Sequence, residues 1–357
     1  MDNRIKYWVF LCSVFVASIT EAQDIHFSQF YQQPLMRNPA LAGIFSGNYR
    51  VITSYRNQWQ SVTVPYKTYC VSAELKSQPS FMPDNDCFTL GIQAARDVAG
   101  STNFSNLEVL PVFSYHKNVS GENSVNYLSV AFMGGYVQQD FDPNKLIMND
   151  QLTVTNGVFS IQPTTRQTFD NSFVKYANFS AGASFNGSIN YIDYYIAAGI
   201  FHLIKPKLFY SGNIVKLNTK FSLNAGLRQG IGDYNEYDLY ADYFLQGGHS
   251  SFQTGLNYTW IYSSLGEERK AFSLGGIYRL NDALIPVIGL EWDIFKIGIS
   301  YDVNISKLVK ASQYRGGLEL TLSARGFSKA ISQLLNGSES NDLDCPGPRF
   351  GNIPVLY

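Results

Sequence analysis

Residues 295–305 read "FKIGISYDVNI", and this stretch decides the fold. Its residues alternate strictly between apolar side chains and small or polar ones. A period of two places successive side chains on opposite faces of an extended chain, so the stretch predicts a β-strand with one apolar and one polar face. The odd positions carry Phe295, Ile297, Ile299, Tyr301, Val303 and Ile305, and the even positions carry Lys296, Gly298, Ser300, Asp302 and Asn304.

Segments of the same kind recur along the chain, about fourteen in all. Most of them are 9 to 15 residues long, whereas strands of soluble proteins usually have about 5–6 residues. Two of them, 194–204 and 283–293, alternate less cleanly than the rest. The predicted strands are 48–55, 67–75, 88–97, 106–119, 126–140, 173–187, 194–204, 219–231, 236–246, 250–262, 270–280, 283–293, 295–305 and 313–325.

Long strands, even in number and polar on one face, predict an all-β fold: a transmembrane antiparallel β-barrel of the bacterial outer membrane. Closure is required, because an open sheet edge in lipid would leave backbone groups without hydrogen-bond partners. The alternative is an exported soluble β-sandwich, whose strands also alternate. The barrel is favoured because the polar face is dominated by Gly, Ser, Asn and Thr, as expected for a lumen, and is not richly charged.

The composition agrees with this class and excludes others. Charged residues make up 15% of the 357 residues, below the usual quarter, while Tyr and Phe number 24 and 25. No run of 18 apolar residues follows the N-terminus, which excludes helical membrane spans. The net charge of −1 argues against nucleic acid as a partner.

The N-terminal residues 1–22 have the layout of a cleavable signal peptide. Arg4 and Lys6 precede an apolar run from Tyr7 to Ile19, and cleavage is expected after Ala22. We therefore expect an N-terminal segment (23–47), the barrel (48–325) and a C-terminal periplasmic extension (326–357). If both termini are periplasmic, the longest connection, residues 141–172, lies outside the cell, as longer barrel loops do.

Nothing in the sequence predicts an enzyme, a cofactor site or a metal site. The histidines have no nucleophile motif around them, and none lies close to a cysteine. Signal cleavage would leave Cys70, Cys87 and Cys345, so at most one internal disulfide can form. Cys70 and Cys87 are the candidate pair, because they are closest in sequence. The histidines are His26, His116, His202 and His249.

Several charged residues fall at inward positions of the predicted strands. They could define a path for an ion or solute, or they could form a structural network that fills the lumen, and the sequence leaves both open. These residues are Lys220, Arg228, Lys296, Asp302, Arg315, Glu319 and Arg325.

The start of the mature chain carries a recognisable signature. Residues 23–43, "QDIHFSQFYQQPLMRNPALAG", are followed by "YRNQW" at 55–59, "RDVAG" at 96–100, "YRLNDALIPVIGLEW", "IGISYDVNISKL" and the closing "CPGPRF". This set resembles the PorP/SprF family of Bacteroidota outer-membrane proteins over nearly the whole mature chain. Where the family often has Asn-Asp, this chain has Arg96-Asp97. The resemblance implies a role in type IX secretion, with the secretion machinery and its periplasmic subunits as partners. It also implies a cargo, such as a gliding adhesin, that is received through its C-terminal domain and held at the cell surface.

The predicted strand orientation and the family resemblance together predict a docking rim on the outer side. It comprises Arg56, Asn57, Gln58, Trp59, Asp97 and Gly100, together with the 141–172 loop. Trp59 would be the aromatic anchor and Arg56 its polar partner, since Trp and Arg are enriched in binding hot spots. The alternative for Trp59 is a place in the aromatic girdle at the membrane surface.

The N-terminal segment is cut by prolines, and its backbone cannot all be paired in lipid. We expect it to pack inside the barrel as a plug or to cap the periplasmic mouth. The residues expected to carry that role are Phe27, Phe30, Tyr31, Leu35, Asn38 and Pro39. A diffusion pore or small-solute transporter remains the competing function if the lumen is open.

Overall fold

The computed structural model describes residues 25–336, apart from 61–63, 80, 84–85, 122–124, 156–157, 164, 167–171, 190–191, 211–212, 233, 266–267 and 308. The predicted signal peptide lies outside the described residues, as does most of the C-terminal extension. Within the described part of the chain, no helix is long and apolar enough to cross a membrane.

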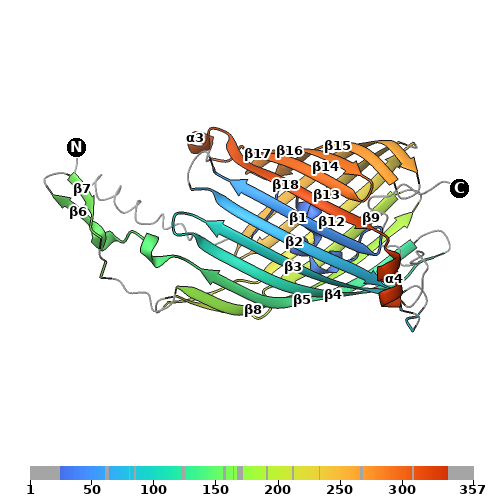
Figure 1. The fold of residues 1–357 in the computed structure, drawn as a ribbon, viewed down its shortest axis with the longest axis horizontal. Helices are drawn as coiled ribbons and strands as arrows, with labels where there is room; N and C mark the ends of the chain where they lie inside the picture. The colour runs from blue at the N-terminus through green and yellow to red at the C-terminus, as the bar shows by residue number, and fades with distance from the viewer. Residues whose placement is uncertain are drawn as a thin grey trace.

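Fourteen of the described strands form one closed antiparallel barrel (Figure 1). The ring closes between the first and last strands, with Tyr49 opposite Gly326 and Gln58 opposite Gly317. This confirms the predicted barrel. Its strands are β1 (Tyr49–Gln58), β2 (Tyr66–Ser77), β3 (Cys87–Ala99), β4 (Phe104–Asn118), β5 (Val125–Asp140), β8 (Phe173–Ile189), β9 (Ile192–Phe201), β12 (Lys220–Ile231), β13 (Asn235–Gln246), β14 (His249–Leu265), β15 (Glu268–Arg279), β16 (Ala283–Trp292), β17 (Phe295–Asn304) and β18 (Arg315–Gly326).

The alternation in β17 decides which face meets the membrane. Ile297 and Ile299 are 47% and 46% exposed, whereas Ser300 and Asp302 are 2% and 3% exposed. The apolar set therefore points outward, where lipid would cover it, and the polar set points into the lumen. This is the pattern of a transmembrane barrel, because a soluble sheet would bury the apolar set.

The two ends of the barrel differ. One end bears the long connections 141–172 and 202–219, and we assign it to the cell exterior because external loops are the longer ones. Each connection contains a small hairpin that the sequence did not predict. These hairpins are β6 (Leu152–Thr155) with β7 (Val158–Ile161), after η3 (Pro143–Lys145) and η4 (Asn149–Gln151), and β10 (Lys207–Tyr210) with β11 (Asn213–Lys216). The β6–β7 hairpin stands well away from the rim (Figure 1).

Two short helices flank the last strand at opposite ends. α3 (Val309–Ser312) precedes β18 on the outer side, and α4 (Lys329–Asn336) follows it at the periplasmic end (Figure 1). Asn48 ties α4 to the start of the barrel, because its Nδ2 donates to Ser328 O and Ser332 Oγ, each at 2.9 Å. The C-terminal extension thus begins as a short helix at the seam between β1 and β18.

The predicted Cys70–Cys87 disulfide is wrong. Cys70 is a free, buried thiol, and Cys87 is disulfide-bonded to another cysteine. In the β2–β3 hairpin, Cys70 lies opposite Ala95, about eight positions from the level of Cys87. At about 3.4 Å per residue, that separation is roughly 27 Å, far beyond the Cα distance that a disulfide spans. Cys12 and Cys345 lie outside the described residues.

Candidate functional site

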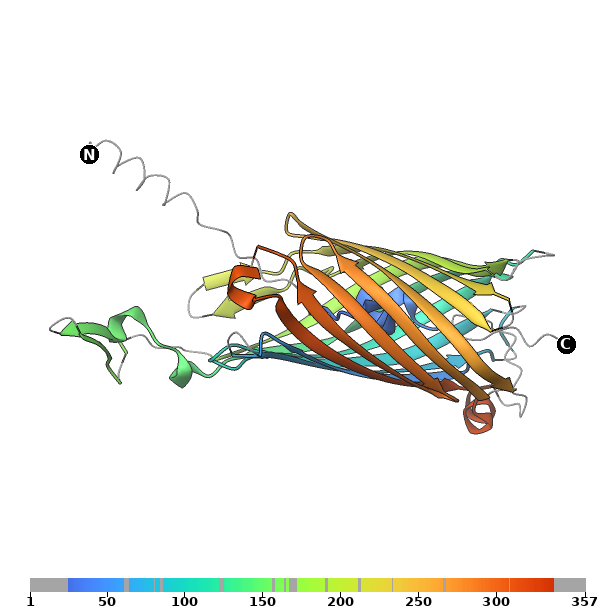
Figure 2. The same ribbon diagram turned by 90° about the horizontal axis from the view of Figure 1, so that it is seen from above.

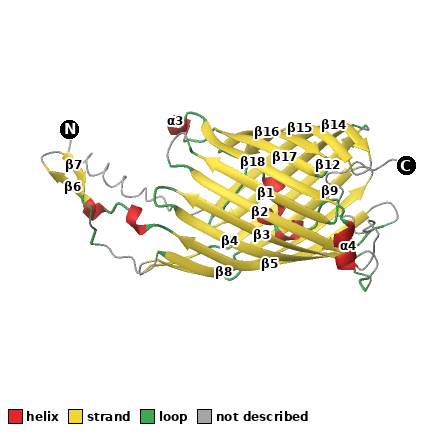
Figure 3. Cartoon of the chain, in the orientation of Figure 1, coloured by secondary structure: helices red, strands yellow, loops and turns green. Residues whose placement is uncertain are grey.

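The N-terminal segment runs through the inside of the barrel. Its three short helical turns lie within the ring of strands (Figures 2 and 3). Proline begins the second and third of them, where a missing N–H costs nothing, and Asn38 also caps the third by accepting a hydrogen bond from Ala40 N at 2.9 Å. The turns are η1 (Phe30–Gln32), α2 (Pro34–Arg37) and η2 (Pro39–Leu41).

The apolar residues of the segment are buried against the lumen wall. Phe30 and Leu41 pack with Tyr195, Tyr240 and residues of β15 and β16. A second cluster joins Leu35 and Ala40 to β4, β5 and β9, and a third joins Phe27 to Cys70 and Ala95. Burial of this kind stabilises by about 25 cal/mol per Å² of apolar surface. The segment therefore supplies the barrel with the apolar core that its lumen would otherwise lack.

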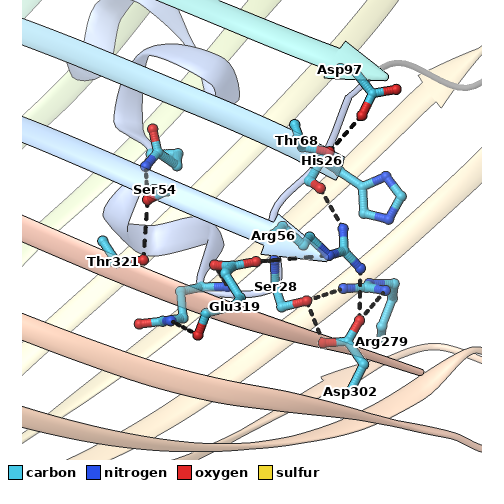
Figure 4. Close-up of polar contacts among 12 residues, drawn as sticks. His26, Ser28, Ser54, Arg56, Thr68, Asp97, Arg279, Asp302, Glu319 and Thr321 are labelled. Atoms are coloured by element: carbon cyan, nitrogen blue, oxygen red, sulfur yellow. Dashed lines mark hydrogen bonds and ion pairs between the residues drawn. The ribbon is translucent and has the colours of Figure 1, made fainter. Parts of the chain in front are cut away.

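The first polar anchor of the segment is at Ser28 and Gln29. Both backbone N–H groups donate to the carboxylate of Glu319 on β18, at 2.5 and 2.8 Å. The Ser28 hydroxyl donates to Asp302 on β17 (Figure 4). These two backbone N–H groups have no access to water inside the barrel, and both donate to a carboxylate instead. Hydrogen bonds to a charged acceptor are stronger than those to a neutral one.

Arg56 and Arg279 balance these carboxylates (Figure 4). Arg56 is 2.7 Å from Asp302 and 3.8 Å from Glu319, and its guanidinium also donates to the carbonyl of His26. Arg279 lies 3.4 Å from Asp302 and donates to Ser28 Oγ at 3.2 Å. Strands β1, β15, β17 and β18 therefore converge on the start of the segment.

The second anchor is the single charge within residues 27–43, Arg37. Its Nε and Nη2 donate to both carboxylate oxygens of Asp242 on β13, at 2.8 and 2.6 Å, and Nη2 also donates to Tyr195 OH at 2.7 Å. Asn224 holds the same carboxylate from β12 at 2.9 Å. The guanidinium lies 5.1 Å from the centre of the Phe30 ring, within the range of a cation–π contact.

The third anchor lies toward the periplasmic end. Gly43 N donates to Glu74 on β2 at 2.9 Å, and Arg50 pairs with the same carboxylate at 2.7 Å. Lys76 donates to the carbonyl of Phe45 at 2.6 Å. Anchors in the outer half, at mid-depth and at the periplasmic end fix the segment along the length of the lumen.

Two glycines of the wall make room for the segment. A β-carbon at Gly298 on β17 would collide with Gln29 Oε1, and one at Gly182 on β8 would collide with Asn38 Oδ1. Glycine lets a polar side chain of the segment touch the strand backbone directly.

The predicted docking residues do not form one exposed patch. Arg56 is 1% exposed and engaged inside the lumen, so its prediction as a contact for cargo was wrong. Asp97 lies in the same row as Arg56, across Thr68, whose hydroxyl donates to it at 2.5 Å. Trp59 follows β1 at the outer rim, half-buried, with its N–H bonded to Gly316 O at 2.9 Å. Asn57, Gln58 and Gly100 are also half-buried at this end.

Most of the predicted inward charges serve structure. Asp302 and Glu319 hold the segment, Arg228 pairs with Asp238 at 2.5 Å, and Lys296 pairs with Glu291 at 2.6 Å. Arg315 differs, because it is exposed at the outer end of β18. Among the residues that the structure describes, no group of three or more His, Cys, Asp or Glu side chains could hold a metal ion.

The sequence did not reveal that Asp242 and Glu74 are partners of the segment. It also did not reveal the hydrogen bonds that Ser28 and Gln29 make with Glu319. One signal was available, because an arginine alone in an apolar stretch that leaves water needs an acidic partner. The sequence did not say which strand supplies it.

Three of the solved structures that resemble this chain are outer-membrane proteins of different kinds. The translocator domain of the autotransporter NalP from Neisseria meningitidis has 10% identity and a TM-score of 0.40, over 83% of this chain and 95% of that one. The CymD monoaromatic hydrocarbon channel has 11% identity and a TM-score of 0.41, over 83% and 93%. CdiB from Acinetobacter baumannii has 10% identity and a TM-score of 0.37, over 78% of this chain and 60% of that one.

No curated protein sequence matches the chain. A family model described as "Type IX secretion system membrane protein PorP/SprF" matches residues 19–323. The match covers most of the 357 residues, including the N-terminal segment and thirteen complete strands of the outer-membrane barrel. The chain therefore belongs to the PorP/SprF family of type IX secretion system membrane proteins.

Proposed function

We propose that this barrel is a non-enzymatic surface anchor that receives a secreted protein through its C-terminal domain and holds it at the outer face of the membrane. The observation that carries the proposal is the filled lumen. Phe27, Phe30 and Leu35 are each 3% exposed or less, and the anchors along the lumen tie the segment to strands around the ring. A barrel filled in this way is suited to binding at its ends rather than to conducting solutes through its middle.

The outer end offers the larger surface for such binding. Its two hairpins expose apolar side chains: Leu152 is 50% exposed, Ile161 56%, Phe209 52% and Val215 53%. Exposed apolar groups gathered at one end of a barrel favour a protein partner. Trp59 lies at the same end, so it remains in the proposed contact surface, whereas Arg56 does not.

The test is to identify what co-purifies with the tagged, full-length protein extracted from outer membranes in mild detergent. We expect one dominant secreted protein. Secretion-machinery subunits without a dominant cargo would instead make the barrel a shared component. A barrel that purifies alone and conducts ions would overturn the anchor and support a diffusion pore.

Two variants sharpen this test. Trp59→Ala, and replacement of residues 143–166 by a short Gly-Ser linker, should each reduce the amount of retained cargo. Trp292→Ala is the matched control, because Trp292 is 60% exposed at the periplasmic end of β16. Gel mobility with and without heating checks that each variant still forms a barrel. Cargo retained equally in all three variants would remove the outer rim from the contact surface.

A further inference from the structure

A basic cavity lies between the N-terminal segment and the barrel wall, in the periplasmic part of the lumen. Its volume is about 80 Å³. One wall is the segment itself, from Tyr31 to Ile44, and the others come from β1, β9, β12, β13, β17 and β18. Pockets for drug-sized ligands are several times larger, so this cavity suits a group of a few heavy atoms.

The described residues that line the cavity include five cationic side chains and no acidic one. They are Arg37, Arg50, Arg228, Lys296 and Arg325. The carboxylates that pair with Arg50 and Lys296, which are Glu74 and Glu291, are not among the lining residues. The side chains that line the cavity are therefore either positively charged or uncharged.

Two of these cations oppose each other directly. Arg50 on β1 and Arg325 on β18 are partners in the closing strand pair. Like charges directly opposite on neighbouring strands are destabilising, and this pair lies inside a barrel, where screening by water is reduced. Lys296 is the register partner of Ser323, which also lines the cavity two residues before Arg325. A negatively charged group bound between these cations would reduce their repulsion.

We propose that this cavity binds an oxyanion group, phosphate or carboxylate, that enters from the periplasm. Arg50, Lys296 and Arg325 each lie one residue from the periplasmic end of their strand and are only partly buried, so they are accessible from that side. Guanidinium groups bind carboxylate and phosphate with two parallel hydrogen bonds. The Ser323 hydroxyl adds a donor at the same wall. This inference does not rest on the proposed anchoring role, which concerns the opposite end of the barrel.

The test is thermal unfolding of the purified full-length barrel in detergent, with inorganic phosphate compared with chloride at equal ionic strength and pH. At ten times its Kd, phosphate should raise the unfolding temperature by about 2 °C. An Asp-rich peptide is the second probe. Stabilisation by phosphate assigns the site to free anions, and stabilisation by the peptide alone assigns it to a carboxylate carried on a polypeptide. Stabilisation by neither overturns the proposal.

Three variants locate the effect. Arg325→Gln should abolish the response to the anion, whereas Arg315→Gln, at the outer end of the same strand, should keep it. Ser323→Asp places a carboxylate in the cavity, so it should raise the unfolding temperature without phosphate and remove any further response. This variant keeps the test decisive if Arg325→Gln fails to fold. A response that Arg315→Gln and Ser323→Asp share equally would place the anion elsewhere and overturn the proposal.

Discussion

Arg37 of the N-terminal segment and Asp242 of β13 form a two-point ion pair in the middle of the lumen, with N–O distances of 2.8 and 2.6 Å. Their side chains are 5% and 0% exposed. The pair joins residues 205 positions apart in the sequence, so it is a direct link between the plug-forming segment and the wall.

Breaking this pair from one side should destabilise the barrel strongly. Arg37→Gln or Asp242→Asn leaves one buried charge without its partner, which costs about 3–5 kcal/mol. Replacing both, as in Arg37→Met with Asp242→Leu, should cost less than either single change. Urea unfolding followed by tryptophan fluorescence checks this, and single variants as stable as the unaltered protein would show that the pair contributes little.

Adding one methyl group to β17 should loosen the contact between the segment and the wall. Gly298→Ala puts a β-carbon where Gln29 Oε1 now lies, so the Gln29 side chain must move away from β17, and the ion conductance of the reconstituted barrel should rise. Gly276→Ala is the control, because a β-carbon there meets nothing within 4 Å. Equal conductance in both variants would contradict the close fit.

Deleting residues 24–43 tests the plug directly. The deletion removes the apolar cover of the lumen and leaves Asp242 and Glu319 without their partners on the segment. We expect either a strongly raised conductance in planar bilayers or a failure of the barrel to assemble. Normal assembly with unchanged conductance would exclude a plugging role.

Arg56 and Trp59 are close in sequence but should behave differently. Arg56→Ala removes the guanidinium that balances Asp302 and Glu319, so it should lower stability by about 3–5 kcal/mol. Trp59→Ala, at the outer rim, should change stability much less and act on cargo retention. Measuring unfolding and cargo in parallel separates the two roles, and a matching loss of stability in both variants would refute the distinction.

The cysteines give a chemical check. Cys70 is 1% exposed, so a maleimide should label it only after the barrel is unfolded, without prior reduction. Cys87 should need reduction as well as unfolding. In the predicted mature chain, 23–357, the remaining cysteine is Cys345, and non-reducing peptide mapping should link it to Cys87. Recovery of a Cys70–Cys87 peptide would contradict the β2–β3 register.

The sequence predicted the strands best where lumen and membrane demand different residues. In β17 the inward positions are Gly298, Ser300 and Asp302, and the alternation is strict. In β16 the inward positions Ala283, Ile285 and Val287 pack against the cluster that contains Phe30, so both faces are apolar and the period of two fades. In β9 the inward residues Tyr195 and Ala197 also belong to this apolar cluster, so its alternation is weak as well. β9 ends at Phe201, whereas the predicted strand ended at residue 204.

The candidate site was harder to predict for a related reason. The alternation of residues in β1 predicts that Arg56 points into the lumen. The docking-rim hypothesis instead placed Arg56 on the outer surface because it lies near the outer end of β1. The partners of the N-terminal segment depend on how the strands are staggered around the ring, which no local pattern encodes. Local alternation of residues was therefore enough to predict the strands. The site depends on contacts between residues hundreds of positions apart in the sequence.

The contact of Ser28 and Gln29 with Glu319 also constrains the order of assembly. Two residues of the N-terminal segment are held by the last strand, about 290 positions away, and Arg56, on the other side of the β1–β18 seam, is the register partner of Glu319. Contacts of such high sequence separation form late, because the loop between them must close first. The anchor of the segment and the closing strand pair both need β18 in place, so a chain that lacks β18 can complete neither the ring nor this anchor.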